Sequence, residues 1–262
     1  VDALPNFPKD ETDRNRTSPF AFTGNKFEFR SLGSSISISF PNVILNTIVA
    51  EEFSQFSDIL EKSADFTKDL NELIRKTLNE HSRIIFNGNG YSQEWVEEAE
   101  CRGLLNLKTT SDAMPHYLAQ KNIDMFERHG VFSQTEIRSR YDVQMEEYVK
   151  VLHIEARTMI GMTRKQILPG VFKYVRDIAA SIREVQGIGC DTQCRAQIDT
   201  LQKAQDLIDR IHREVGALEQ IVADTFGSED ITSTANYYTT WVIPAMNSLR
   251  EAVDSLESMV GY

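Results

Sequence analysis

The chain contains very little cysteine. Only three of its 262 residues are cysteines, Cys101, Cys190 and Cys194, and they are too few and too scattered to form a disulfide framework. This scarcity favours a reducing compartment, so we expect a cytoplasmic protein. Cys190 and Cys194 in "CDTQC" have the spacing of one helical turn, but no histidine stands near them in the sequence. We therefore interpret them as ordinary thiols rather than metal ligands.

Long apolar runs and an excess of positive charge are also missing. No apolar run approaches the roughly 20 residues that span a bilayer, and no charged-then-apolar signal peptide opens the chain, so we expect no membrane partner. Lysine and arginine number 28 against 39 acidic residues, for a net charge of −11. Because contact with a phosphate backbone needs a basic surface, the charge disfavours general nucleic-acid binding. The first residue is valine rather than methionine, which suggests a processed chain or a fragment.

Several catalytic signatures are absent or weak. The five histidines are isolated and form no HExxH-type pair. A single GxG occurs, in "FNGNGYS", and it is better interpreted as a turn between helices than as a phosphate-binding loop. Candidate chemistry must therefore come from another part of the chain.

Most of the sequence has a helical pattern. Hydrophobic residues make up 41% and charged residues 26%, values typical of a globular protein with a buried core. From about residue 42 onward apolar residues recur at helical spacing, so we predict a mainly α protein whose bulk is a bundle of long helices. The first expected helix runs from about residue 42 to Arg83, with or without a break, the second begins after the cap Ser92, and the third covers residues 109–130 and stops at Gly130. The fourth begins at a capping box of Ser133 and Glu136, the fifth runs from the cap Asp191 to about Phe226, and the sixth runs from about Ile231 to Met259. Pro169 and Gly170 should kink the fourth of these, and Pro244 lies inside the last.

One helix has a seam typical of a coiled coil. Its apolar residues step by threes and fours, with Gln205 as a polar interruption. The seam comprises Ile198, Leu201, Gln205, Ile208, Ile211, Val215, Leu218 and Val222.

The N-terminal part differs from the rest. Residues 1–25 are rich in proline and polar side chains and should form a loop. Residues 26–30 alternate, with Lys26, Glu28 and Arg30 on one parity and Phe27 and Phe29 on the other. We predict a strand with both phenylalanines in the core. Residues 36–40 alternate in the same way and predict a second short strand.

The charged row of this strand has two interpretations. Lys26, Glu28 and Arg30 could be solvated charges on an amphipathic strand. Alternatively the strand lines a polar cleft, where Glu28 ligates a cation and the basic residues bind phosphate or carboxylate groups. Arg14 and Arg16, just upstream, would then add to the same positive field.

The residues around this strand carry a family resemblance. "DRNRTSPFAFTGNKFEFR", residues 13–30, followed by "GSSISISFPNVILNTIVAE", resembles the signature near the end of the catalytic domain of type III glutamine synthetases. The downstream segments "RIIFNGNGYSQEWVEEAECRGLLNLKTTSDAMP", "HGVFSQTEIRSRYDV" and "ILPGVFKYV" are similar to the same family. The resemblance extends over essentially the whole chain.

The resemblance implies roles for individual residues. Asn15 and Arg16 match the family's Asn-Arg pair, whose arginine steadies the transferred phosphate. Glu28 matches a glutamate that ligates a catalytic metal, and Arg30 matches an arginine that holds substrate and the phosphorylated intermediate. Lys26 stands where classical glutamine synthetases have an arginine for the nucleotide phosphates. A further arginine of the classical enzymes is absent here, because "TSPFAF" takes its place.

The resemblance also implies an activity and an organisation. The family joins ammonia to glutamate through a γ-glutamyl phosphate, with ATP and Mg²⁺ or Mn²⁺, in homo-oligomers of stacked hexameric rings. Residues 1–50 would be the end of its α/β catalytic domain, and residues 51–262 a C-terminal helical domain. Since residues 1–50 offer one well-placed carboxylate, Glu28, we expect this chain by itself to be inactive.

Two other functions stay open at the level of sequence. The bundle shows no evident catalytic cluster, so the chain could be a non-catalytic helical module for interaction or assembly. It could also be a metal-independent anion-binding domain that uses Arg14, Arg16 and Arg30.

Overall fold

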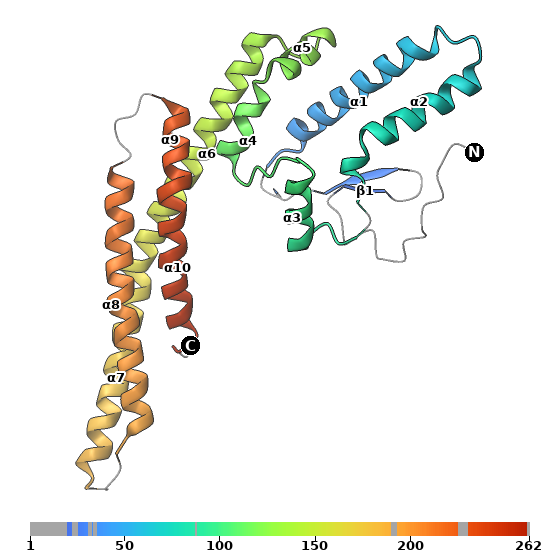
Figure 1. The fold of residues 1–262 in the computed structure, drawn as a ribbon. Helices are drawn as coiled ribbons and strands as arrows, with labels where there is room; N and C mark the ends of the chain where they lie inside the picture. The colour runs from blue at the N-terminus through green and yellow to red at the C-terminus, as the bar shows by residue number, and fades with distance from the viewer. Residues whose placement is uncertain are drawn as a thin grey trace. The chain divides into compact units, whose positions relative to one another are not determined.

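The computed structural model describes residues 20–22, 26–30, 33, 36–86, 88–189, 193–224 and 230–260 (Figure 1). Helices dominate from residue 39 onward, so the mainly α prediction is confirmed. Among the described helices, none is both long and apolar enough to cross a membrane. The chain divides into two compact units, which are treated separately below: unit 1 comprises residues 1–108 and 118–137, and unit 2 comprises residues 109–117 and 138–262.

Unit 1 joins a small β-hairpin to a set of helices. Strands β1 (Phe20–Phe22) and β2 (Phe27–Phe29) pair antiparallel, with Phe20 opposite Phe29 and Phe22 opposite Phe27. The strand predicted over residues 26–30 is confirmed at residues 27–29, and its partner lies where a loop was expected. The helices of unit 1 are α1 (Ser39–Leu60), α2 (Phe66–Glu80), the short 3₁₀ helix η1 (Ser82–Ile84), α3 (Gln93–Cys101) and α5 (Gln120–Arg128).

The strand predicted over residues 36–40 is wrong. Helix α1 already begins at Ser39, and Ile36 and Ile38 are exposed. Gly33 has a φ of +126°, and its carbonyl accepts a hydrogen bond from the Ile36 amide (2.9 Å), so the chain turns there instead of extending. The apolar residues that follow then join a helix, with Pro41 tolerated in its first turn.

Helix boundaries in unit 1 follow local capping signals. The predicted helix to Arg83 is broken, because Asp65 accepts a hydrogen bond from the Lys68 amide (3.2 Å) and caps α2. Ser92 caps α3 as predicted, through a hydrogen bond from the Trp95 amide (3.3 Å). The helix expected over residues 109–130 is two helices, α4 (Thr110–Tyr117) of unit 2 and α5, and Gly130 stops the second with a φ of +62°.

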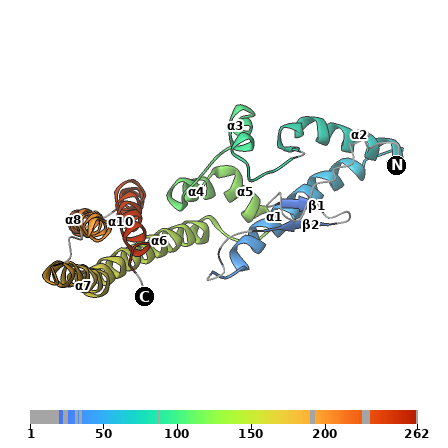
Figure 2. The same cartoon turned by 90° about the horizontal axis from the view of Figure 1, so that it is seen from below.

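Unit 2 is a bundle of long and short helices. They are α4, α6 (Gln134–Met162), which begins in unit 1, the π-helical turn η2 (Thr163–Ile167), α7 (Leu168–Gly187), α8 (Arg195–Ala223), α9 (Ile231–Tyr237), the π-helical turn η3 (Tyr238–Val242) and α10 (Ile243–Glu257). The predicted capping box opens α6: the Ser133 amide donates to Glu136 (2.8 Å), and the Glu136 amide donates to the Ser133 hydroxyl (3.3 Å). Helix α8 lies beside both α7 and α10 (Figures 1 and 2).

The apolar seam of α8 forms the centre of the unit 2 core. The C-terminal part of the seam is as predicted, but the N-terminal part differs. Ala204 is buried, Gln205 is exposed and donates to Asp209 (3.3 Å), and Ile198 is 40% exposed. The predicted cap Asp191 lies outside the described residues, and Cys194 precedes the helix with a φ of +47°. The buried seam residues are Ile208, Ile211, Val215, Leu218 and Val222.

A proline follows each π-helical turn after one intervening residue. Turn η2 precedes Pro169 and turn η3 precedes Pro244, both at the second position of the following helix. Proline has no amide hydrogen, so the carbonyl four residues earlier loses its α-helical partner, and that carbonyl lies within the π-turn in both cases. The sequence predicted a kink at Pro169, and just before this residue the helix has π-helical instead of α-helical hydrogen bonds.

The two π-turns contain threonines in opposite situations. Thr163 is 1% exposed, and its hydroxyl has no hydrogen-bond partner among the described residues. Thr239 shares hydrogen bonds with the hydroxyls of Ser111 (2.8 Å) and Tyr148 (3.1 Å), and donates to the Ala235 carbonyl (3.1 Å).

We predict that valine has opposite effects at these two sites. Thr163→Val removes an unpaired buried hydroxyl and should raise the free energy of unfolding by about 1 kcal/mol. Thr239→Val removes the hydrogen bond of the Tyr148 hydroxyl and one of the two hydrogen bonds of the Ser111 hydroxyl, which keeps Thr109 (3.0 Å), and should lower the free energy of unfolding by about 1–2 kcal/mol. Urea denaturation of both variants measures the difference, and a loss of stability in Thr163→Val would contradict the assignment.

Candidate functional site

The hairpin brings three of the four predicted site residues together. Lys26 and Arg30 flank strand β2, and Glu28 lies at its centre. The Arg30 guanidinium donates to Glu28 Oε2 (3.0 Å), and Lys26 Nζ lies 3.7 Å from Glu28 Oε1. Alternation along the strand places these side chains within reach of one another. The fourth residue, Arg16, lies outside the described residues, as does Arg14.

The prediction that Phe27 and Phe29 are buried is wrong for this chain. Phe27 is 64% exposed and Phe29 is 49% exposed, whereas Glu28 and Arg30 are half-buried. The physical reason is that a two-stranded hairpin has no inside of its own. Its apolar side chains become buried only when another layer covers them.

The charges of this row neutralise one another in part. Each oxygen of Glu28 faces a cation, and the row as a whole carries one excess positive charge. Such pairing is expected of solvated charges on an amphipathic strand. The same pairing would also orient the Arg30 guanidinium so that it can bind a phosphate or carboxylate group. Both interpretations of the row therefore stay predictions.

The described residues do not by themselves fit a divalent cation. Mg²⁺ requires about six oxygen ligands in octahedral geometry. Glu28 offers one carboxylate, already paired with Arg30 and Lys26, and no group of three or more histidine, cysteine, aspartate or glutamate residues suited to a metal occurs in the described part of the chain. A metal site that includes Glu28 would need ligands from elsewhere.

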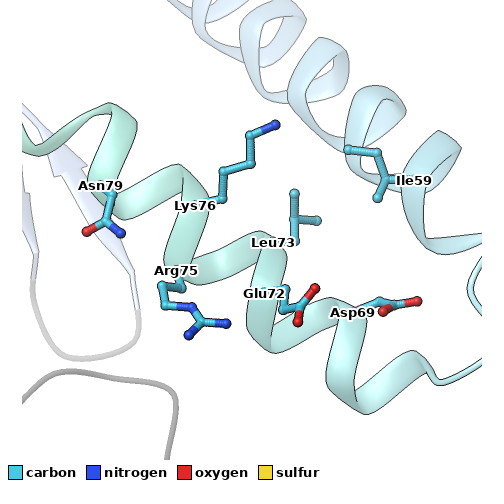
Figure 3. Close-up of a pocket in the computed structure, with 7 residues that line it drawn as sticks. All are labelled: Ile59, Asp69, Glu72, Leu73, Arg75, Lys76 and Asn79. Carbon is cyan, nitrogen blue, oxygen red and sulfur yellow. The ribbon is translucent and has the colours of Figure 1, made fainter.

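A second candidate is an open groove between α1 and α2 (Figure 3). It has a volume of about 520 Å³. In Figure 3, Ile59 of α1 and Leu73 of α2 form its apolar side, and acidic and basic residues follow along α2. Asp69 accepts a hydrogen bond from the Ser63 hydroxyl (2.6 Å), and Lys76 pairs with Glu80 (3.8 Å). Sequence reasoning missed the groove because it depends on how two helices pack. Its lining residues are Ile59, Asp69, Glu72, Leu73, Arg75, Lys76 and Asn79.

A third feature is a nearly buried carboxylate. Glu51 of α1 is 8% exposed. Its side chain accepts hydrogen bonds from Gln55 (2.8 Å), from His129 Nε2 (2.8 Å) and from the Arg128 guanidinium, so it joins α1 to the C-terminal end of α5. The hydrogen bond from Gln55, followed by that from His129 and the charge of Arg128, holds the pKa of Glu51 below its ordinary value of 4.5. From sequence, nothing linked Glu51 to residues nearly 80 positions away.

Comparisons with known proteins place the chain in a family. Residues 69–186 match the profile of the glutamine synthetase C-terminal domain. The chain is 39% identical to glutamine synthetase of Butyrivibrio fibrisolvens over 259 residues and 37% identical to type-3 glutamine synthetase of Dictyostelium discoideum over 267 residues, which covers 97% and 99% of this chain. It is 30% identical to glutamine synthetase of Bacteroides fragilis over 98% of its length.

The chain therefore belongs to the glutamine synthetase family, and it carries that family's C-terminal domain. The resemblance to type III glutamine synthetases drawn from the sequence is confirmed. The chain spans 36% of the length of each of these three relatives.

We predict that Glu51→Gln destabilises the chain in a pH-dependent way. Because the folded-state pKa of Glu51 is lowered, its contribution is present above the ordinary carboxyl pKa of 4.5 and is lost as the pH falls through the lowered value. The variant should melt below the wild type at pH 7, and the difference should shrink as the pH falls below 4.5. Thermal denaturation followed by circular dichroism measures this.

The matched control for this prediction is Glu52→Gln, one residue along the same helix, where the side chain is exposed. Its melting temperature should stay close to that of the wild type. Equal losses in the two variants at pH 7 would show that the contacts of Glu51 with Arg128 and His129 contribute nothing specific.

Proposed function

We propose that this chain is the C-terminal portion of a glutamine synthetase. The full-length protein would join ammonia to glutamate at the expense of ATP, through a γ-glutamyl phosphate. The observation that supports this is the similarity to three proteins named glutamine synthetase over 97–99% of the chain, which takes in the strand at residues 26–30 as well as the helices.

The basic residues near the strand suit the proposed chemistry. Phosphorylating a carboxylate brings two anions together, so fixed cations must offset their repulsion. Arg30 would hold the substrate and the phosphorylated intermediate, and Arg16 the transferred phosphate. Lys26 would interact with the phosphates of ATP. The ion pair of Arg30 with Glu28 (3.0 Å) supports a fixed guanidinium at the end of the strand.

Glu28 is proposed to contribute one oxygen ligand to a site for Mg²⁺ or Mn²⁺. Hard divalent cations prefer carboxylate oxygens, which is the chemistry that the bound metal would need from this residue. The remaining ligands would come from parts of the full-length protein outside this chain. ATP, glutamate and ammonia are likewise proposed as ligands of the full-length protein.

We propose a division into residues 1–50, the end of the catalytic domain, and residues 51–262, the helical domain. Helix α1 runs through this boundary and is apolar around most of its circumference, with Ile48, Val49 and Phe53 exposed. A helix that is apolar on all sides is normally buried. Together with the exposed Phe27 and Phe29, this supports a larger domain that covers both elements. We propose that the full-length protein is a cytoplasmic homo-oligomer, as the family resemblance implies.

We predict that Glu28→Gln inactivates the full-length enzyme without unfolding it. The variant keeps the side-chain volume but loses a charged oxygen ligand, so turnover should fall by about 100-fold or more and a higher metal concentration should be needed. Glutamine formation is measured at limiting and saturating Mg²⁺. Near-normal activity at limiting metal would contradict the ligand role.

The control for this variant is Glu80→Gln. Glu80 is an exposed glutamate that also pairs with a lysine, Lys76 (3.8 Å), so the substitution removes the same charge from a similar pair. Its activity should match that of the wild type. Circular dichroism of both variants checks that the fold is intact.

We further predict that the 262-residue chain alone forms no glutamine. Its described residues provide one carboxylate at the candidate site, far short of a complete metal site. The purified chain is incubated with ATP, Mg²⁺ or Mn²⁺, glutamate and ammonia, and glutamine and phosphate are measured. Turnover above that of a Glu28→Gln chain would show that the site is more complete than proposed.

A further inference from the structure

The loop that leads into α3 contains asparagine followed by glycine. This pair of residues occurs twice in the chain, as Asn87-Gly88 and Asn89-Gly90 within "FNGNGYS". Asn87 lies outside the described residues, whereas Asn89 and Gly90 are described and lie between η1 and α3. The Asn89 side chain is exposed. The loop is not part of the candidate site on strand β2.

Asparagine before glycine has a particular reactivity. The amide nitrogen of the following residue can attack the Cγ atom of the asparagine side chain, because the two atoms then close a five-membered ring. The reaction is intramolecular, so its rate depends on how closely the two atoms approach. A side chain on the following residue hinders this approach, and glycine has no Cβ atom.

The hydrogen bonds around Asn89 favour this attack. Asn89 Oδ1 accepts a hydrogen bond from the Tyr91 amide (3.0 Å), an arrangement common in turns. A donor at this oxygen draws electrons from Cγ and stabilises the negative charge that develops on the oxygen during the attack. The Gly90 amide donates no hydrogen bond to another described residue, so no such bond has to break before its nitrogen reacts.

The other asparagines in the described part of the chain are less suited to this reaction. All but one lie in helices, where the amide of the following residue is held in a helical hydrogen bond. The exception is Asn106, which is exposed in a loop as Asn89 is, but Leu107 follows it. The Asn106 side chain donates to Glu100 (3.0 Å). Asn106 is therefore an internal comparison for Asn89.

We propose that Asn89 is a site of spontaneous deamidation and that its isoaspartate product weakens the cap of α3. The Gly90 nitrogen forms a bond to Asn89 Cγ, the bond from Cγ to Nδ2 breaks, and the proton lost by the Gly90 amide leaves with Nδ2 as ammonia. Water then opens the succinimide at one of its two carbonyls, which gives aspartate or isoaspartate. Water is the only co-reactant, and nothing is oxidised or reduced. The proposal does not depend on the proposed function.

The two products differ in their effect on α3. The Asn89 carbonyl accepts a hydrogen bond from the Ser92 amide (3.1 Å), and the Ser92 hydroxyl caps α3 through the Trp95 amide (3.3 Å). Aspartate keeps this backbone and adds a negative charge ahead of a helix N-terminus, where such a charge is favourable. Isoaspartate lengthens the backbone by one carbon atom, so it displaces the carbonyl and disturbs the cap.

A disturbed cap would loosen the contacts that hold the C-terminal end of α3. Arg102 follows the last residue of this helix, and its guanidinium donates to the carbonyls of Arg83 (3.1 Å) and Ile85 (3.0 Å). The same guanidinium lies 5.3 Å from the centre of the Trp95 ring. Segments that open locally become sites of proteolysis. Isoaspartate at position 89 should therefore make the peptide bond after Arg102 more accessible to trypsin.

The test begins with deamidation in the wild-type chain. Peptide mass spectrometry measures the mass gain caused by replacing an NH₂ group with OH, and fragment spectra distinguish Asn89 from Asn87. Asn89 should be modified at least about tenfold faster than Asn106 in the same sample. Its rate should be higher at about pH 9 than at about pH 6, because the attack requires the Gly90 amide to lose its proton. Enzymatic methylation detects the isoaspartate product.

The matched variant is Gly90→Ala, which places a Cβ atom beside the attacking nitrogen. Modification of Asn89 should slow at least about tenfold in this variant, while the rate at Asn106 should not change. Circular dichroism checks that the variant is folded, and the comparison of Asn89 with Asn106 in the wild type needs no variant. Modification of Asn89 no faster than that of Asn106, or an unchanged rate in folded Gly90→Ala, would overturn the proposal.

Limited trypsin digestion tests the effect on α3. The substitution Asn87→Gln leaves Asn89-Gly90 as the only such pair in the chain, so ageing of this variant reports on Asn89. After incubation at about pH 9 it should be cut after Arg102 faster than the same chain carrying Asn89→Asp, which has the charge of the product without the longer backbone. Equal rates of cleavage, with isoaspartate present at position 89, would overturn the assigned effect on the cap.

Discussion

The burial of one apolar stripe on α8 is the interaction on which unit 2 depends. Ile211, Val215 and Leu218 are fully buried, and they meet Leu249 and Leu256 of α10 in the same cluster. Burying one such side chain contributes about 1.5–3 kcal/mol, against a net stability of about 5–15 kcal/mol for a typical domain. Five such residues on two helices therefore weigh more than any single polar contact in the bundle.

The polar contacts of unit 2 complete this packing. Tyr141, Tyr148 and His153 of α6 form hydrogen bonds with the hydroxyls of Thr232 (2.9 Å), Thr239 (3.1 Å) and Tyr238 (2.8 Å), so α6 is joined to α9 and η3 at three positions. A buried polar group without a partner is costly, so these pairs favour one alignment of α6 with α9 and η3 over others. Apolar packing supplies stability here, and the hydroxyl pairs specify register.

Unit 1 differs from unit 2 in that many of its apolar side chains are exposed. Its hairpin exposes Phe27 and Phe29, and α1 exposes apolar residues around much of its surface, while a charged contact, Glu51 with Arg128 and His129, joins α1 to α5. Such a surface is expected of a part whose apolar partners belong to another segment. The three relatives are almost three times as long as this chain.

Features that depend on near neighbours could be predicted from the sequence. Helical period, the caps at Ser92 and Ser133, the stop at Gly130 and the alternation at residues 27–29 were all predictable, because capping and side-chain direction act over a few residues. The row of Lys26, Glu28 and Arg30 follows from the same alternation. Which alternating runs form strands, and which apolar side chains are buried, depends on the packing of segments far apart in the chain. Ser39 and Phe40 joined a helix while Ile36 and Ile38 stayed exposed before it, Gln205 turned outward, and Glu51 paired with α5, because burial depends on what lies opposite in space. The hairpin shows the limit most clearly, since its apolar pattern requires a covering layer that the described residues do not supply.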